Sequence, residues 1–81
     1  HAMEDYLEAI LVLKNDQDRV RVKDLADKLN IKPPSVIGMV KNMVNAGFVT
    51  HKVRQDIKLT RKGLNVALRM KERHQVLKEF F

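Results

Sequence analysis

Two short stretches of helical periodicity, separated by a break that few residue types can make, limit the fold of this chain more than any other feature. Apolar residues recur at three- and four-residue steps across residues 22–29 and again across residues 36–43. The break contains Asn30, one of the few residue types that accept the left-handed conformation at a helix end. Pro34 has the fixed φ and the missing N–H that suit a first helical position, and we expect it to hold Pro33 outside the helix. This spacing predicts a helix-turn-helix.

The segments on either side supply the other elements of a winged helix. Before the motif, periodic apolar residues predict a helix over about residues 3–14, and the alternating residues 19–21 predict a short extended pairing. After the motif, Gly47 is placed to end the second helix. Residues 48–53 and 57–59 then predict the two strands of a hairpin, because they are rich in β-branched residues or alternate in polarity.

The last part of the chain predicts one long helix. Thr60 has the side chain to cap a helix that runs from about Arg61 to the end of the chain, with apolar residues along one side. The predicted fold is mostly α with a small β-hairpin: a winged helix-turn-helix with a three-helix core, a wing and a long C-terminal helix. It occupies residues 3–81 as one domain, and we interpret His1-Ala2 as a cloning remnant. The predicted apolar side of the last helix consists of Leu64, Ala67, Leu68, Val76, Leu77, Phe80 and Phe81.

The positive charge of the chain is concentrated in its middle. The net charge is +6, and residues 32–62 carry seven bases against Asp56 alone, whereas residues 1–18 carry five acids and one base. Such a one-sided block favours a polyanionic partner. The chain contains no cysteine, which excludes thiolate chemistry, and no apolar run approaches the roughly 18 residues of a membrane span. We expect a cytoplasmic protein whose partners include neither a membrane nor a small-molecule substrate.

The basic block coincides with the two elements that a winged helix presents to DNA. A recognition helix lies in the major groove with its N-terminal residues nearest the base edges, and Arg54 at the wing tip suits the minor groove or a phosphate. Gly38 leaves a gap where a longer side chain could read a base, and we assign Met39 to the core. The predicted contacts to double-stranded DNA are Arg21, Lys23, Lys32, Pro34, Ser35, Gly38, Lys41, Asn42, Lys52, Arg54, Lys58, Arg61 and Lys62.

Residues 3–81 as a whole resemble one family, the metal-dependent repressors of the diphtheria toxin repressor and manganese transport regulator type. The opening residues 4–10 (Glu-Asp-Tyr-Leu-Glu-Ala-Ile) and the late Arg73-His74 carry the most specific part of the resemblance. The resemblance implies a repressor that binds operator DNA as a homodimer when a divalent cation is bound. The remaining matches are residues 22–26 (Val-Lys-Asp-Leu-Ala), 32–36 (Lys-Pro-Pro-Ser-Val) and the commoner 59–63 (Leu-Thr-Arg-Lys-Gly).

The resemblance also implies a partial metal site, with Asp5 and Glu8 on the first helix and His74 on the last helix as ligands. Asp5 and Glu8 are three residues apart and so share one helical face, and carboxylates with an imidazole suit Mn²⁺ or Fe²⁺. Aspartate at position 5 is similar to the manganese-type members. Lys78 stands where some relatives have a carboxylate, which argues against an ancillary site. The resemblance implies that the helices with the remaining ligands and most of the dimer interface follow Phe81, so we expect this chain to lack both. Three ligands are too few for a complete site.

The residues alone leave other interpretations open. A winged helix of another regulator type would use the acids and His74 only structurally, and a protein-interaction winged helix would present the same basic face to an acidic partner. An enzyme is not expected, because Ser35 has no plausible His-Asp partners in the sequence and the chain has no glycine-rich phosphate loop. The sequence favours a sequence-specific DNA-binding domain of an iron- or manganese-dependent repressor.

Overall fold

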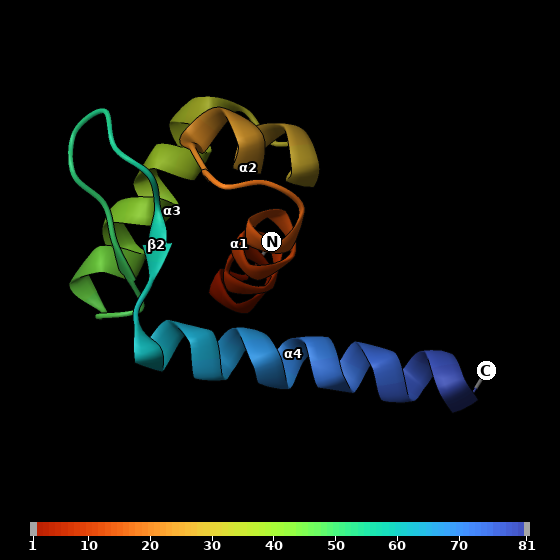
Figure 1. Ribbon diagram of the computed structural model, residues 1–81. Helices are drawn as coiled ribbons and strands as arrows, with labels where there is room; N and C mark the ends of the chain where they lie inside the picture. Colours follow the sequence, from red (N-terminus) through yellow and green to blue (C-terminus); the bar gives the residue numbers. More distant parts are fainter. Residues whose placement is uncertain (1, 81) are drawn as a thin grey trace.

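The computed structural model describes the backbone of residues 2–80 and the side chains of residues 2–75. Figure 1 shows a group of three helices and a hairpin, with the last helix lying along one side of that group as a long rod. No helix in this described part is long and apolar enough to cross a membrane. In chain order the elements are α1 (Met3–Asp16), α2 (Val22–Leu29), α3 (Pro33–Asn45), β1 (Val49–Thr50), β2 (Lys58–Leu59) and α4 (Arg61–Phe80).

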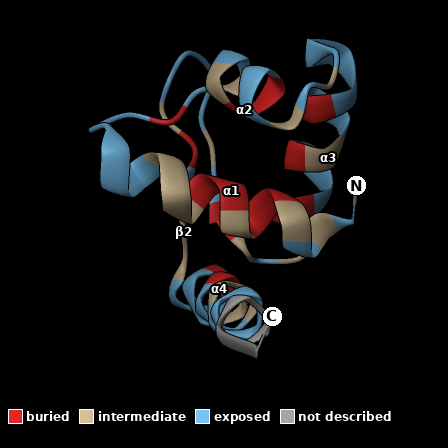
Figure 2. Cartoon of the chain, turned by 90° about the vertical axis from the view of Figure 1, so that its right-hand side faces the viewer, coloured by how far each residue is buried: buried red, intermediate tan, exposed pale blue. Residues whose placement is uncertain are grey.

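The central helix α1 joins the helix-turn-helix to α4. Its buried side chains include Tyr6, Leu7 and Ile10, which belong to one apolar cluster with Leu25 of α2 and Ala67 of α4. Figure 2 shows this buried surface running along α1, with the exposed residues on the outer sides of the surrounding helices. Because α4 packs mainly against α1, the position of α4 depends on that helix more than on α3 or the wing.

The helix-turn-helix forms as predicted, with one correction at the start of α3. Asn30 adopts the left-handed conformation with φ of 55°, and the N–H of Ile31 donates to the carbonyl of Ala26 at 2.9 Å, which closes the end of α2. The helix α3 begins at Pro33 rather than Pro34, so the expectation that Pro33 lies outside the helix is wrong. The first N–H groups of any helix lack intrahelical partners, so prolines at both of the first two positions forfeit no hydrogen bond.

The wing, which runs from β1 through β2, is a loop held by a very short ladder. Val49 pairs with Leu59 and Thr50 with Lys58 in an antiparallel register, so each strand is shorter than the sequence predicts. Beyond these pairs the chain turns, and Arg54 at the tip adopts φ of 62°. A non-glycine residue in that conformation is uncommon, and the turn that it makes ends the regular pairing early.

The chain before α2 is tied to the wing by one backbone hydrogen bond. The N–H of Ile57 donates to the carbonyl of Val20 at 2.8 Å, at the place where the sequence predicts an extended pairing, but residues 19–21 form no strand or bridge. The helix α1 extends to Asp16, two residues past the predicted end. Gly47 follows α3 with φ of 79°, as expected of a residue that ends a helix.

The start of α4 is fixed against the end of α3. The hydroxyl of Thr60 accepts the N–H of Gly63 at 3.1 Å, which confirms the predicted cap, and it donates to the carbonyl of Gly47 at 2.6 Å. A Cβ on Gly63 would lie only 1.9 Å from the carbonyl oxygen of Phe48. The two elements therefore approach each other so closely that only glycine fits at that position.

The apolar side predicted for α4 is only partly used by the core. Ala67 is fully buried, and Val66, which the sequence pattern does not select, packs against the same cluster. Leu64 and Leu68 are 37% and 48% exposed, so they lie at the margin of the core rather than within it. The predicted positions Val76, Leu77, Phe80 and Phe81 lie outside the residues whose side chains the structure describes.

Candidate nucleic-acid interface and acid–histidine pair

The helix α3 has a core side and a solvent side, and the solvent side carries the predicted recognition residues. Val36, Val40 and Met43 are buried, and Met39 packs half-buried against the same core, which confirms its assignment. A Cβ at Gly38 would meet no atom within 4 Å, so this position is an open gap on the solvent side. The predicted contacts that are exposed here are Lys32, Pro34, Ser35, Gly38, Lys41 and Asn42.

Beside the wing, three cations and one carboxylate line a polar pocket of about 280 Å³. Arg54 and Lys58 are predicted DNA contacts, whereas Arg19 is absent from the predicted set. Arg19 reaches this pocket because the hydrogen bond between Val20 and Ile57 holds its segment against the wing. The alternation around Val20 is the sequence signal that could have identified it. The pocket is lined by Arg19, Arg54, Gln55, Asp56 and Lys58.

The start of α2 presents two more of the predicted cations. Arg21 is the residue before the first helical turn, Lys23 lies within that turn, and both are exposed. The backbone N–H of Arg21 donates to Oδ2 of Asp24 at 2.8 Å. A phosphate at this helix end would meet two cations and the helix dipole, with one carboxylate already bound there.

The two predicted cations at the start of α4 differ in their surroundings. Arg61 is exposed. The Nζ of Lys62 donates to the carbonyl of Ala46 at 2.9 Å and lies 4.6 Å from the centre of the Phe48 ring. Lys62 is exposed as well, but its ammonium binds one of the free carbonyls at the end of α3.

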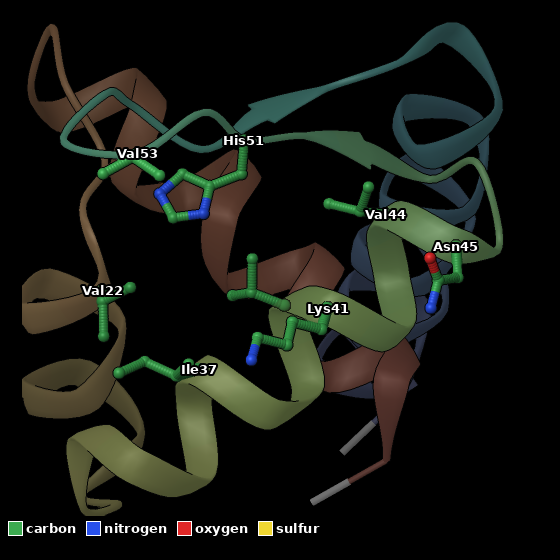
Figure 3. A pocket seen from close by; sticks show the side chains of 8 residues that line it. Val22, Ile37, Lys41, Val44, Asn45, His51 and Val53 are labelled. Carbon is green, nitrogen blue, oxygen red and sulfur yellow. The ribbon is translucent and has the colours of Figure 1, made fainter.

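A largely apolar groove of about 410 Å³, here called the α3–wing groove, lies between α3 and the wing. In Figure 3, Lys41 points into it from α3 and His51 points into it from the opposite wall. Lys41 is one of the predicted DNA contacts and His51 is not, because no local pattern in the sequence marks which wing side chains turn toward α3. The groove is lined by Val22, Ile37, Val40, Lys41, Val44, Asn45, His51 and Val53.

An acid–histidine pair joins α1 to α4 away from the wing. The Nδ1 of His74 lies 2.8 Å from Oε2 of Glu8, and the side chains are 47% and 17% exposed respectively. These residues are 66 positions apart in the sequence, and packing of α4 against α1 brings them together. A carboxylate oxygen and an imidazole nitrogen at this separation are both ligand types that suit Mn²⁺ and Fe²⁺.

Asp5, the third predicted ligand, has a different partner. Its Oδ2 accepts the N–H of Ala2 at 3.1 Å at the start of α1, and it lines a pocket with Glu8 and Lys28. Among the described residues, no three His, Cys, Asp or Glu side chains form a group that could hold a metal ion. The structure brings two of the three predicted ligands into contact and does not gather Asp5 with them.

Comparison with known families identifies the lineage of this fold. Residues 1–57 match the sequence model described as iron dependent repressor, N-terminal DNA binding domain. The chain belongs to this family. The match spans α1, the helix-turn-helix and most of the wing, and it confirms the family that the sequence resembles. Among the interpretations left open by the residues, the DNA-binding domain of an iron-dependent repressor family is the one supported.

Curated relatives agree with this assignment. The HTH-type transcriptional regulator MntR of Shouchella clausii is 34% identical over 79 residues, which are 98% of this chain and 55% of that protein. An uncharacterized HTH-type transcriptional regulator of Methanocaldococcus jannaschii is 36% identical over 80 residues, covering 98% of this chain and 64% of that protein. The chain thus spans about half the length of the MntR relatives that it matches.

Solved structures share the fold. ScaR with bound Zn²⁺ matches with a TM-score of 0.79 at 23% identity, over 91% of this chain and 34% of that one. A transcriptional regulator from Thermotoga maritima matches with a TM-score of 0.68 at 25% identity, over 91% of this chain and 56% of that one. These neighbours are winged-helix regulators, so the predicted fold class is confirmed.

Proposed function

We propose that this chain is the DNA-reading domain of a cytoplasmic, iron- or manganese-dependent transcriptional repressor that binds double-stranded operator DNA as a homodimer. The observation that carries the proposal is the placement of exposed cations on α3 and the wing in a chain of a DNA-binding family. The chain acts by binding, with neither a catalytic step nor a small-molecule substrate.

The exposed residues divide into two roles in this proposal. Ser35 near the start of α3 and Asn42 two turns later have hydrogen-bonding side chains, so they are candidates for base contacts in the major groove. Arg54 and Lys58 on the wing, together with Arg19, supply charge without sequence information and fix the position of the domain on the duplex. Gly38 has no side chain to contact bases in the major groove, so recognition there depends more on the shape of the DNA.

Selection of duplexes from a random-sequence library tests this division. We expect an enriched sequence with two inverted half-sites about one helical turn, or a multiple of it, apart if the protein binds as a dimer. Asn42→Ala should relax the preference at one base position in each half-site, whereas Lys58→Ala should weaken all sequences about equally. Failure to enrich any sequence would contradict a role in sequence-specific repression.

The acid–histidine pair supports the metal-dependent part of the proposal. Glu8 and His74 fit a hard divalent cation, because their oxygen and nitrogen already lie 2.8 Å apart and can be ligands of one ion. Asp5 would join them by exchanging its hydrogen bond to Ala2 for the ion. When bound, the cation supplies positive charge that holds α1 and α4 together through their ligands. Glu8 and His74 thereby link the acidic first helix to the helix that leads away from the DNA-reading elements.

Calorimetric titration of the chain with Mn²⁺ alone, and with Fe²⁺ under anaerobic conditions, tests the ligand assignment. We expect weak binding that Glu8→Gln and His74→Gln each remove, and Asp5→Asn should weaken it if Asp5 completes the site. Glu4→Gln, which removes a neighbouring exposed carboxylate from α1, is the matched control and should leave the titration unchanged. Equal metal binding by the parent, the Glu8 variant and the His74 variant would contradict the assignment.

A further inference from the structure

The α3–wing groove has an unusual composition for the middle of a basic surface. Five of its eight lining residues are aliphatic, and Ile37, Val44 and Val53 among them are 45%, 38% and 87% exposed. Lys41 on one wall and His51 on the other are the residues that carry or can carry positive charge, and none of the eight is acidic. A ligand for this groove therefore needs an apolar part flanked by negative charge.

We propose that the α3–wing groove seats the sugar–phosphate backbone of one DNA strand, with Lys41 and His51 binding its phosphates from opposite walls and the aliphatic side chains packing against deoxyribose. This inference rests on the proposed DNA-binding function and adds His51 and Ile37 to its contacts. It assigns the sugar–phosphate backbone to the groove as its ligand, which the charges of α3 and the wing alone do not specify.

The geometry of the duplex supplies the first argument. A recognition helix occupies the major groove and a wing reaches the adjacent minor groove. These two grooves are separated by one sugar–phosphate backbone, so that strand has to pass between α3 and the wing. The α3–wing groove lies between those two elements. Lys41 lines it from the side of α3 and His51 from the side of the wing (Figure 3).

The chemistry of the backbone supplies the second argument. Each nucleotide presents an apolar deoxyribose between two anionic phosphates, which matches aliphatic side chains flanked by Lys41 and His51. Val22 at the start of α2 closes one end of the groove, next to Arg21 and Lys23. A DNA strand that leaves the groove at that end meets Arg21 and Lys23, so positive charge lies along the backbone on both sides of the groove's apolar part.

The charge of His51 gives this contact a specific signature. Histidine is the side chain type that changes charge between about pH 5 and 8, and a phosphate favours its protonated form. We therefore expect a contact between the His51 imidazole and a phosphate to strengthen DNA binding at the lower end of that pH range. Lys41 is the charged group that faces His51 from α3, Val22 from α2 is uncharged, and Lys52 and Arg54 follow His51 on the wing.

Titration of the chain with a mixed-sequence duplex at pH values from 5.5 to 8 and at constant ionic strength, once with Mn²⁺ and once with a chelator, tests the proposal. We expect the affinity of the parent to rise from pH 8 to pH 5.5 by on the order of tenfold more than the affinity of His51→Gln rises over the same range. His51→Arg, which keeps a positive charge at every pH, should bind at pH 8 about as tightly as the parent binds at pH 5.5. Identical pH profiles for the parent and His51→Gln would overturn the assignment of His51.

The aliphatic side of the groove has its own test. Ile37→Ala should lower affinity for all duplexes about threefold to tenfold with no change in the salt dependence, since it removes apolar contact and no charge. If a second copy of the chain covers the groove instead, Ile37→Ser will lower the sedimenting mass and leave DNA affinity intact, which would overturn the proposal. A parent that binds no duplex either with Mn²⁺ or with a chelator refutes the proposed function itself, whereas a parent that binds with unchanged His51 and Ile37 variants refutes this inference alone.

Discussion

His74 on α4 contacts Glu8 on α1 through a 2.8 Å interaction between Nδ1 and Oε2. This contact joins α1 to α4, which packs mainly against α1. Strand β1 of the wing packs instead against α3, so the contact lies between a different pair of elements. Because the His74 side chain is 47% exposed and solvent screens its interaction with Glu8, we expect Glu8→Gln to change the free energy of unfolding by less than about 1 kcal/mol in urea denaturation. A much larger loss would mean that the pair holds the fold together rather than serving as a ligand pair.

The pocket at the wing predicts that Arg19 and Arg54 contribute equally to DNA binding. Both side chains line the same pocket, so we expect each to approach a phosphate and each alanine variant to make the slope of log K against log salt shallower by about 0.9. Arg69→Ala, which removes a cation that bonds the Asn65 carbonyl within α4, is the matched control. An Arg19→Ala slope equal to that of the parent and of Arg69→Ala would contradict the inclusion of Arg19.

The close approach of α4 to the end of α3 predicts opposite effects at two glycines. Gly63→Ala would place a methyl group 1.9 Å from the Phe48 carbonyl oxygen, so we expect it to lower the free energy of unfolding by at least about 3 kcal/mol. Gly38→Ala adds a methyl group in open space within a helix and should raise it by about 0.5–1 kcal/mol. Urea denaturation of both variants checks the pair, and a mild effect at Gly63 would contradict the tight contact.

The cap at the start of α4 predicts a third stability effect. Thr60→Ala removes the acceptor for the Gly63 N–H and the donor to the Gly47 carbonyl, and should cost about 1–2 kcal/mol in thermal or urea unfolding. Thr60→Ser keeps the hydroxyl and should recover most of that stability. If serine and alanine are equally destabilising, the methyl group of Thr60 rather than its hydroxyl is responsible.

The sequence predicts the parts of this fold that local chemistry determines. Asn30, Gly47 and Thr60 mark the helix ends correctly, because a left-handed residue or a capping hydroxyl acts within a few positions of the chain. The strands of the wing are predicted too long, since strand length depends on pairing across the hairpin and the left-handed Arg54 carries no glycine or asparagine signal.

The sequence predicts the exposure of the candidate residues where a helix face determines it, and it misses residues whose positions depend on tertiary contacts. The exposed residues of α3 follow from helical periodicity, so the recognition face is predicted from the pattern alone. Arg19 and His51 line their pockets because of how the wing folds against other segments. The alternation around Val20 is a sequence signal for Arg19, whereas no local pattern marks His51. Lys62 is a predicted DNA contact whose ammonium binds the Ala46 carbonyl within the protein. Its place in the basic block of the sequence gives no indication of that bond.

The salt dependence of duplex binding tests the central claim most directly. Titration of this chain with duplex DNA at several salt concentrations should give a slope of log K against log salt on the order of −4 to −7, as expected for several phosphates contacted by the cations of α2, α3 and the wing. A flat slope, or no binding to duplex DNA at low salt, would contradict the assignment of this surface to DNA.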